Sequence, residues 1–414
     1  MTKPNEPMRM LAPHSFRQAL SRRALFQIGG AAAGLAIVAA ACGDNSSSPA
    51  TTGASGGTTG GGSDLLSQYS NVVNKATGQL NMFTWGDYND PDIVGALAEK
   101  TLGITMKVDY YPSNEDLITK LSAANGNSGF DVVVPTGPYI PQMIQKGLLQ
   151  KFDLSKLPNM SNVDPLYLKQ QWDPGNEYSV TKDWGSTGWF YNKTVVTKEL
   201  KTWSDFYDAT ANLASGRTSW LDTAPNVCGP YFWANGINWN TQDAAQIDAC
   251  EKFLVDEFAQ HIKAFDSYPS TKLAEGAYSL AMGWNGDLRQ AYVRIADAGG
   301  NPEDWVWVLG SPATELWMDN YCIPVGAPNV DAAHSWINWL LTPEISIKDL
   351  KYHGYNSGMK NIDKLIAELV PDLKHADMIF FSDEQVKGMQ TGAVNSAQNR
   401  LIDIYDKVKA AAAG

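Results

Sequence analysis

Three short segments of this chain place a tryptophan two or three residues before an aspartate. The segments are Trp85-Gly-Asp87-Tyr88, Trp284-Asn-Gly-Asp287 and Trp317-Met-Asp319. An indole face attracts a cation for ~0.5–2 kcal/mol per contact, and a carboxylate adds a charge-assisted hydrogen bond of roughly 1.5–3 kcal/mol. The chain has 14 tryptophans, too many to line one site. Three such pairs, each expected at the end of a strand, nevertheless predict a shared pocket for a small organic cation.

Length and charge restrict the class of protein. A chain of 414 residues exceeds what one hydrophobic core usually supports, so two lobes are expected. The chain has 32 basic and 44 acidic side chains, and its basic excess is confined to the first 63 residues. An acidic body argues against nucleic-acid binding and agrees with attraction of cationic ligands, although acidity can also serve only to keep an exported protein in solution.

The N-terminal segment predicts export. Arg22 and Arg23 precede an uncharged, apolar stretch over 24–41, as in a twin-arginine signal peptide. This stretch is short and rich in Gly and Ala, so it is marginal as a membrane-spanning helix. Three alanines then precede Cys42, a pattern that resembles a bacterial lipobox in which this cysteine is lipidated. We therefore expect 1–42 to be a lipoprotein signal peptide and the protein to be anchored to the outer face of the cytoplasmic membrane.

The segment 43–63 is almost wholly Gly, Ser, Thr and Ala. Such a composition cannot bury enough apolar area to fold, so this segment is expected to be a flexible linker. Three further cysteines follow it: Cys228, Cys250 and Cys322. In an oxidising compartment Cys228 and Cys250 could form a disulfide, and three buried free thiols are the equal alternative.

No group of residues has the spacing of a catalytic or metal site. The five histidines are scattered, without an H-E-x-x-H or C-x-x-C motif, so neither a metal nor a cofactor is expected. No G-x-S-x-G or phosphate-binding glycine motif follows a predicted strand. Paired carboxylates beside tryptophan could serve a glycosidase, and tryptophan also stacks on sugar rings. A glycosidase and a sugar receptor are therefore weighed as alternatives to a receptor for cations.

The order of apolar and helical segments predicts an α/β fold. Strands alternating with helices are typical of parallel α/β layers, in which ligands bind beyond the carboxyl ends of strands. The expected strands are 80–84, 105–110, 130–135, 188–191, 218–221, 280–284, 304–309 and 317–324. The expected helices are 92–101, one that begins at Ser113 with Asp116 as its capping partner, 139–146, 244–258, 288–298 and 332–341.

Six segments of the body carry a family resemblance. They are Phe83-Thr-Trp-Gly-Asp-Tyr88, Phe130-Asp-Val-Val-Val-Pro-Thr136, Trp184-Gly-Ser-Thr-Gly188, Leu221-Asp222, Met282-Gly-Trp-Asn-Gly-Asp287 and Trp317-Met-Asp319. In this order and spacing they resemble the periplasmic spermidine- and putrescine-binding proteins, the solute receptors of polyamine ABC importers. The resemblance implies the type II periplasmic binding protein fold, in which two α/β lobes joined by a two-crossover hinge close on the ligand. Lobe 1 would comprise 64–182 with 319–361, and lobe 2 would comprise 183–318 with 362–414.

The resemblance also implies how the ligand is held. Four aromatic side chains would form a box around the carbon chain of an amine: Trp85, Tyr88, Trp284 and Trp317. Asp287 and Asp319 would hold one ammonium group, and Tyr355 would close a wall. Asp87 and Thr136 would lie near the opposite end of the ligand.

Two positions depart from the family pattern. Asn226 stands where an acidic residue usually follows Leu221-Asp222, and Pro138 stands where spermidine binders carry a tyrosine. Asp87 or Asp222 could compensate for the missing charge. The expected function is that of a monomeric exported receptor that binds a diamine or polyamine, of the putrescine or spermidine class, and delivers it to a membrane ABC permease. A receptor for another cationic or zwitterionic amine is the alternative, and no catalytic residue is expected.

Overall fold

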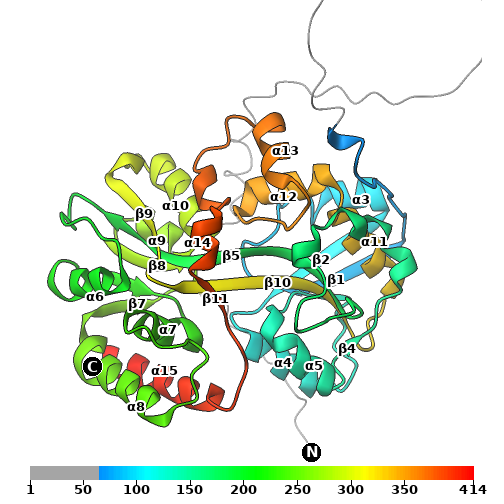
Figure 1. Ribbon diagram of the computed structural model, residues 1–414. Coiled ribbons are helices and arrows are strands. Elements are labelled where there is room, and N and C mark those ends of the chain that lie inside the picture. The colour runs from blue at the N-terminus through cyan, green and yellow to red at the C-terminus, as the bar shows by residue number, and fades with distance from the viewer. Residues whose placement is uncertain (1–64) are drawn as a thin grey trace, which may run out of the picture. The chain divides into compact units, whose positions relative to one another are not determined.

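Two long antiparallel strands organise the computed structural model, which describes residues 65–414. They are β5 (Ser179–Asn192) and β10 (Thr314–Pro324), which pair with each other and run through the middle of the sheet in Figure 1. The sheet order along the main path is β2-β1-β3-β10-β5-β8-β6-β7. The predicted signal peptide with Cys42 and the linker over 43–63 lie outside the described residues.

The first half of the sheet adjoins the C-terminal part of β10. Parallel strands β1 and β2 pair along their whole length, and β3 joins β1 to β10. The strands of this half are β1 (Gly78–Thr84), β2 (Ile104–Tyr110), β3 (Val132–Val133) and β4 (Leu149–Gln150). Its helices are α3 (Ala96–Leu102), α4 (Asn114–Ala123), α5 (Ile140–Gln145), α11 (Val330–Leu340) and α12 (Pro343–His353).

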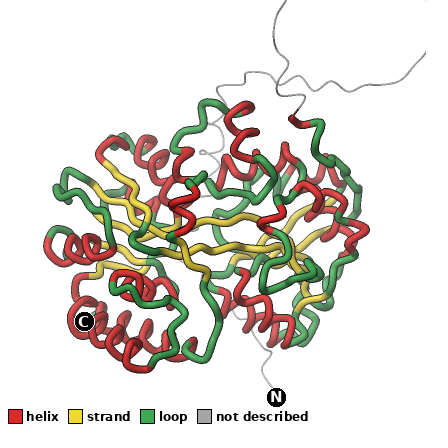
Figure 2. Tube along the Cα trace, viewed as in Figure 1, coloured by secondary structure: helices red, strands yellow, loops and turns green. Residues whose placement is uncertain are grey.

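The second half adjoins the C-terminal part of β5, which pairs with β8 on one side and β9 on the other. Its strands are β6 (Thr218–Trp220), β7 (Ile262–Phe265), β8 (Leu280–Trp284) and β9 (Trp305–Leu309). The helices of this half are α6 (Trp203–Asn212), α7 (Ala224–Ala234), α8 (Ala244–Lys252), α9 (Ser270–Ala274), α10 (Asn285–Asp297) and α15 (Gln398–Ala412). The remaining elements are α13 (Ile362–Leu369), α14 (Asp383–Lys387) and β11 (Met389–Thr391). Helices surround the strands in both halves (Figure 2).

Local sequence signals fix the helices that border the site. Helix α4 begins after Ser113, whose hydroxyl accepts a hydrogen bond from the Asp116 N–H at 3.1 Å, as the sequence predicts. Helix α12 ends at Gly354, which has a φ of 78°. Glycine adopts this left-handed conformation without steric cost. The chain therefore turns sharply there and sets Tyr355 directly after the helix.

Most tryptophans lie in the cores rather than in a pocket. Trp189, Trp203, Trp220 and Trp233 are fully buried together in the second half of the sheet, and Trp336 is buried in the first. The three cysteines of the described chain are free and buried. Of the two alternatives, the structure therefore shows buried free thiols and no disulfide between Cys228 and Cys250. Within 65–414, no helix is both long and apolar enough to cross a membrane.

The predicted α/β fold is confirmed, and its element boundaries differ in instructive places. Strand β8 has the predicted bounds, whereas β5 extends well before the predicted 188–191. The predicted helix 244–258 is α-helical only to Lys252 and continues as a π-helix. Strand β7 was not predicted. The pair Trp317/Asp319 lies inside β10 rather than at a strand end, so the expectation that all three pairs end strands is wrong. The lobe boundaries stay a prediction.

Candidate functional site

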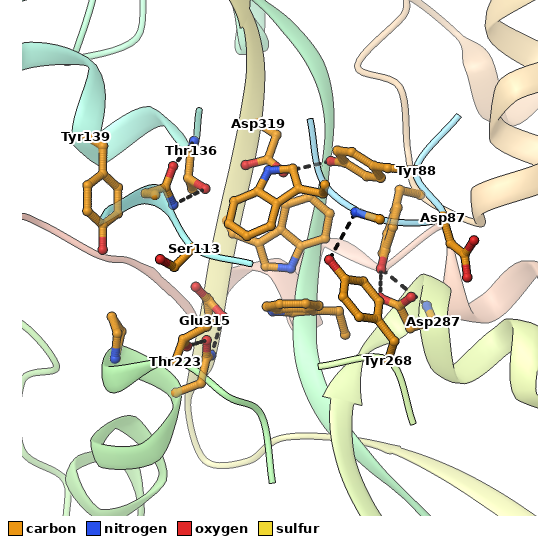
Figure 3. Close-up of a pocket in the computed structure, with 18 of the residues that line it drawn as sticks. Asp87, Tyr88, Ser113, Thr136, Tyr139, Thr223, Tyr268, Asp287, Glu315 and Asp319 are labelled. Atoms are coloured by element: carbon orange, nitrogen blue, oxygen red, sulfur yellow. Dashed lines mark hydrogen bonds between the residues drawn. The ribbon is translucent and has the colours of Figure 1, made fainter. Parts of the chain in front are cut away.

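A hollow lies between the loops that follow β1 and β3 on one side and the starts of α7 and α10 on the other, with β10 as its floor (Figure 3). It holds about 730 Å³ of space free of atoms, part of it open solvent. Ten of the eleven residues predicted to bind ligand line this hollow: Trp85, Asp87, Tyr88, Thr136, Asn226, Trp284, Asp287, Trp317, Asp319 and Tyr355.

Aromatic rings form the walls. Trp85 donates its indole N–H to the Val134 carbonyl at 3.0 Å, which fixes the ring after β1. Its centroid lies 6.4 Å from that of Trp284 at an interplanar angle of 66°. Trp317 meets Tyr355 edge-on at 4.8 Å. These angled rings leave faces and edges directed at the hollow, as an aromatic box for a cation requires.

Asp319 forms one acidic end of the hollow. It is only 6% exposed, its Oδ1 has no hydrogen-bond partner, and its Oδ2 lies 2.8 Å from the Tyr88 hydroxyl. The same hydroxyl bonds Asp183, whose charge is balanced by Lys182 at 2.6 Å. Burial, followed by the charge of Asp183, raises the pKa of Asp319 to about 7, while nearby Thr136 and Tyr88 act in the opposite direction. The residue is thus a buried acid that lacks a cation.

Asp287 lies in the first turn of α10 and is also buried. Its Oδ2 accepts a hydrogen bond from the Tyr355 hydroxyl at 2.5 Å, and its N–H donates to the same hydroxyl at 3.2 Å. Burial raises the pKa of Asp287 to about 7, although the Tyr355 hydrogen bond lowers it. Gly286 permits this approach, because a Cβ there would lie 2.3 Å from the His353 carbonyl oxygen.

The rim beside Asp287 is made by Asp87 and Tyr268. Asp87 is half exposed and pairs with Arg294 of α10 at 3.2 Å. The Gly86 N–H donates to the Tyr268 hydroxyl at 3.1 Å. The structure therefore places Asp87 next to Asp287, whose pKa its charge raises, and not at the Thr136 end where the resemblance put it.

The side of the hollow next to Asn226 and Thr223 carries an acid that the sequence analysis did not identify. Glu315 on β10 is 8% exposed, and its Oε2 accepts hydrogen bonds at 2.7 Å from both Thr187 and Asn226. Burial raises its pKa. Glu115 also lines the hollow, where it accepts a hydrogen bond from Tyr139 at 2.8 Å.

Asp222 does not join the site. Its Oδ1 accepts hydrogen bonds from Tyr405 at 2.6 Å and from Lys409 at 2.7 Å, both on α15, and it is absent from the lining of the hollow. Neither Asp222 nor Asp87 therefore supplies a charge at the Asn226 position, because each is paired elsewhere.

The charge of the lining is one-sided. Its acidic members are Asp87, Glu115, Asp287, Glu315 and Asp319, and none of the lining residues is Lys, Arg or His. Of these acids only Asp87 makes an ion pair within 65–414. No group of described side chains could hold a metal ion. Buried carboxylates without a counter-charge are costly, so the arrangement favours a cationic ligand that supplies one.

Comparison with known proteins places the chain in a family. Residues 92–375 match the family model of the bacterial extracellular solute-binding proteins. The chain belongs to this family. The spermidine/putrescine-binding periplasmic protein of Escherichia coli (strain K12) is 30% identical over 334 residues, covering 80% of this chain and 91% of that protein. The resemblance inferred from the sequence is thereby confirmed.

Solved structures agree with the family and the fold. A protein of Listeria monocytogenes, provisionally described as a spermidine/putrescine ABC transporter, has a TM-score of 0.70 and 27% identity and covers 80% of this chain and 98% of its own. A lipoprotein of Treponema pallidum has a TM-score of 0.69 and 26% identity and covers 80% and 99%. The predicted type II periplasmic binding protein fold is consistent with both.

Proposed function

We propose that this protein is an extracytoplasmic receptor that binds a diamine or polyamine in the hollow and delivers it to an ABC importer. One observation carries the proposal: the lining contains five carboxylates, three of them buried without an ion pair, and no basic side chain. Relatives named for binding spermidine and putrescine support the same ligand class.

The geometry suits such a ligand. An ammonium group beside Asp319 would supply the counter-charge that this buried carboxylate lacks. The carbon chain would then lie against Trp317 and Trp85. Each charge-assisted hydrogen bond contributes about 1.5–3 kcal/mol, and each cation–π contact ~0.5–2 kcal/mol. The family's members bind solutes, and we propose no catalytic role for the carboxylates of this chain.

The alternative ligands fit less well. A zwitterionic amine brings a carboxylate of its own, which would meet acids and no basic partner in this lining. A sugar would leave Asp287 and Asp319 without a counter-charge at neutral pH. Other cationic amines, including agmatine and cadaverine, satisfy the same groups and belong to the proposed class.

A thermal-shift panel with putrescine, spermidine, cadaverine, agmatine and common sugars tests the ligand class. A ligand at 100 times its dissociation constant stabilises the folded protein by about 2.7 kcal/mol. We expect at least one amine to raise the melting temperature. Stabilisation by a sugar with none by any amine would contradict the proposal.

For the cellular location we propose export by the twin-arginine route and lipidation at Cys42, with 43–63 as the tether of a monomeric receptor. A lipoprotein among the structural relatives supports the anchor. Cys42→Ser should move the protein from the membrane fraction to the soluble envelope fraction, and replacing Arg22 and Arg23 by lysine should retain it in the cytoplasm. A Cys42→Ser protein that stays in the membrane fraction would argue against the anchor.

A further inference from the structure

One face of β10 alternates acid, indole and acid. Glu315, Trp317 and Asp319 are two residues apart along the strand and all three line the hollow. Successive side chains of a strand point to opposite faces, so these three share one face. At ~3.3 Å per residue, the Cα atoms of Glu315 and Asp319 lie roughly 13 Å apart. Figure 3 shows the two carboxylates apart from each other, Asp319 beside Tyr88 and Glu315 beside Thr223.

The Glu315 carboxylate is held in place by a directed chain of hydrogen bonds. The Thr223 hydroxyl donates to Asn226 Oδ1 at 2.6 Å, which leaves the amide nitrogen of Asn226 to face Glu315 at 2.7 Å. Thr187 donates to the same Oε2 atom at 2.7 Å, and the Trp284 side chain also hydrogen-bonds the carboxylate. No ion pair among residues 65–414 involves Glu315. A buried carboxylate that is oriented by hydrogen-bond donors and makes no ion pair can bind a cation without first reorienting.

We propose that Glu315 anchors a second ammonium group of the ligand and that Asn226 and Thr187 position its carboxylate. This assignment rests on the proposed function. It places the distal negative charge on the central strand β10 rather than at the start of α7, where this chain has Asn226.

The spacing also bears on ligand length. A fully extended chain advances ~1.2 Å per bond, as three bonds per residue span at most ~3.6 Å in a polypeptide. The terminal nitrogens of putrescine then lie roughly 6 Å apart, and those of spermidine roughly 11 Å. A second hollow shares Glu315, Trp317 and Thr136 with the first and continues towards Trp239 and Gln398. The separation of Glu315 and Asp319 along β10 and the continuation of the hollow past Glu315 both favour a linear triamine over a four-carbon diamine.

Calorimetric titration of the purified protein with spermidine and putrescine tests the assignment. Glu315→Gln keeps the size of the side chain and removes its charge, so spermidine affinity should fall by about 10- to 150-fold. Asp222→Asn is the matched control, because this carboxylate bonds α15 outside the hollow, and it should leave the affinity within about twofold. Thermal unfolding checks that both variants are folded.

A charge swap separates charge from packing. In the double variant Glu315→Gln with Asn226→Asp, the amide and the carboxylate exchange places across the same hydrogen bond. Recovery of tenfold or more in spermidine affinity over Glu315→Gln supports a charge requirement at this junction, and a double variant as weak as the single one contradicts it. Wild-type affinity in Glu315→Gln, or tighter binding of putrescine than of spermidine by the wild-type protein, would overturn the assignment while the proposed function stands. Failure of the wild-type protein to bind either amine would overturn both.

Discussion

Tyr88 has one hydroxyl proton and two carboxylate neighbours, Asp183 and Asp319. The hydroxyl lies within hydrogen-bond distance of an oxygen of each acid, but its single proton can be donated to only one of them at a time. When the proton goes to Asp183, Asp319 lies beside the charge of Asp183 without the Tyr88 donor, which favours the protonated form of Asp319. This agrees with its pKa, which burial raises to about 7. An arriving ammonium group would displace that proton rather than simply add a charge.

Binding of an amine should therefore release protons. Asp287 and Asp319 both have pKa values of about 7 in the empty protein, and a bound cation stabilises their charged forms. We expect affinity to increase as pH rises from about 6 to 8 and then to level off. Calorimetry in two buffers with different ionisation enthalpies measures the protons released. A binding enthalpy independent of the buffer at pH 7 would show that no proton leaves.

The same shift predicts a pH dependence of stability. The folded-state pKa of Asp319 is raised, so the folded protein binds more protons than the unfolded chain between about pH 4 and 7, and stability falls as pH rises through that window. Asp319→Asn removes this contribution. The variant should gain thermal stability relative to the empty wild-type protein on going from pH 5 to pH 8. A constant difference in melting temperature would contradict the assignment of the raised pKa to Asp319.

The two aspartates Asp319 and Asp222 should differ in their effect on binding. Asp319→Asn removes an acid with an unpaired buried oxygen in the hollow, so amine affinity should fall by about 10- to 150-fold. Asp222→Asn changes an acid that bonds Tyr405 and Lys409 and should affect stability only. Titration of both variants with one amine makes the comparison, and equal losses would show that the hollow is not the binding site.

At the scale of elements, close packing between β5 and β10 sets the position of the central indole. Gly185 pairs with Trp317 across the two strands, and a Cβ on Gly185 would lie 2.4 Å from the indole and 2.3 Å from Asn285 Oδ1. Since real Cβ contacts are longer, the indole and the start of α10 would have to move.

Gly185→Ala should therefore weaken amine binding and lower the melting temperature, because overpacking a filled site typically costs about 1–3 kcal/mol. Gly388→Ala is a suitable control, since a Cβ there would have its nearest neighbours at 3.4 Å and the backbone φ is −80°. Titration and thermal unfolding of the two variants test this. Equal affinities and melting temperatures of the two variants would show that the Trp317 indole can shift without cost.

The limits of sequence reasoning are also clearest at this scale. The pairing of indole with acid identified Trp85, Trp284 and Trp317, because ring and charge are adjacent in the chain. Glu315 was missed because the strand was predicted to begin at Trp317, which hid the alternation along β10. Tyr268 was missed with the short strand β7. Asp222 follows β6 much as Asp87 follows β1, and only the fold reveals that Lys409, 187 residues away, covers it.

For the molecule as a whole, the contacts that span the hollow include a hydrogen bond and an ion pair near Asp287. The Gly86 N–H reaches Tyr268 beyond β7, and Asp87 reaches Arg294 of α10. These contacts join the predicted lobe 1 to the predicted lobe 2. Helix α13 was assigned to lobe 2, yet Leu365 packs in one cluster with Leu350 of α12, so the boundary at 361 stays a prediction.

Ligand that touches both sides should favour the closed arrangement by its differential affinity. Small-angle scattering of a chain lacking residues 1–63 should show a smaller radius of gyration with saturating amine than without it. An unchanged radius, with binding shown separately by calorimetry, would indicate a rigid site and no hinge closure.

The pair formed by Asp87 and Arg294 has a consequence for the fidelity of transport. Both side chains are partly exposed, at 49% and 36%, and such an ion pair contributes only about 0–1 kcal/mol, a bias of at most about fivefold. Inverting an equilibrium from 1:99 to 99:1 takes about 5.5 kcal/mol. An ion pair this weak cannot by itself hold the ligand-free receptor in the closed state. The importer would thus meet few receptors that are closed without ligand. Raising the salt concentration screens the ion pair and should reduce that closed, ligand-free fraction further.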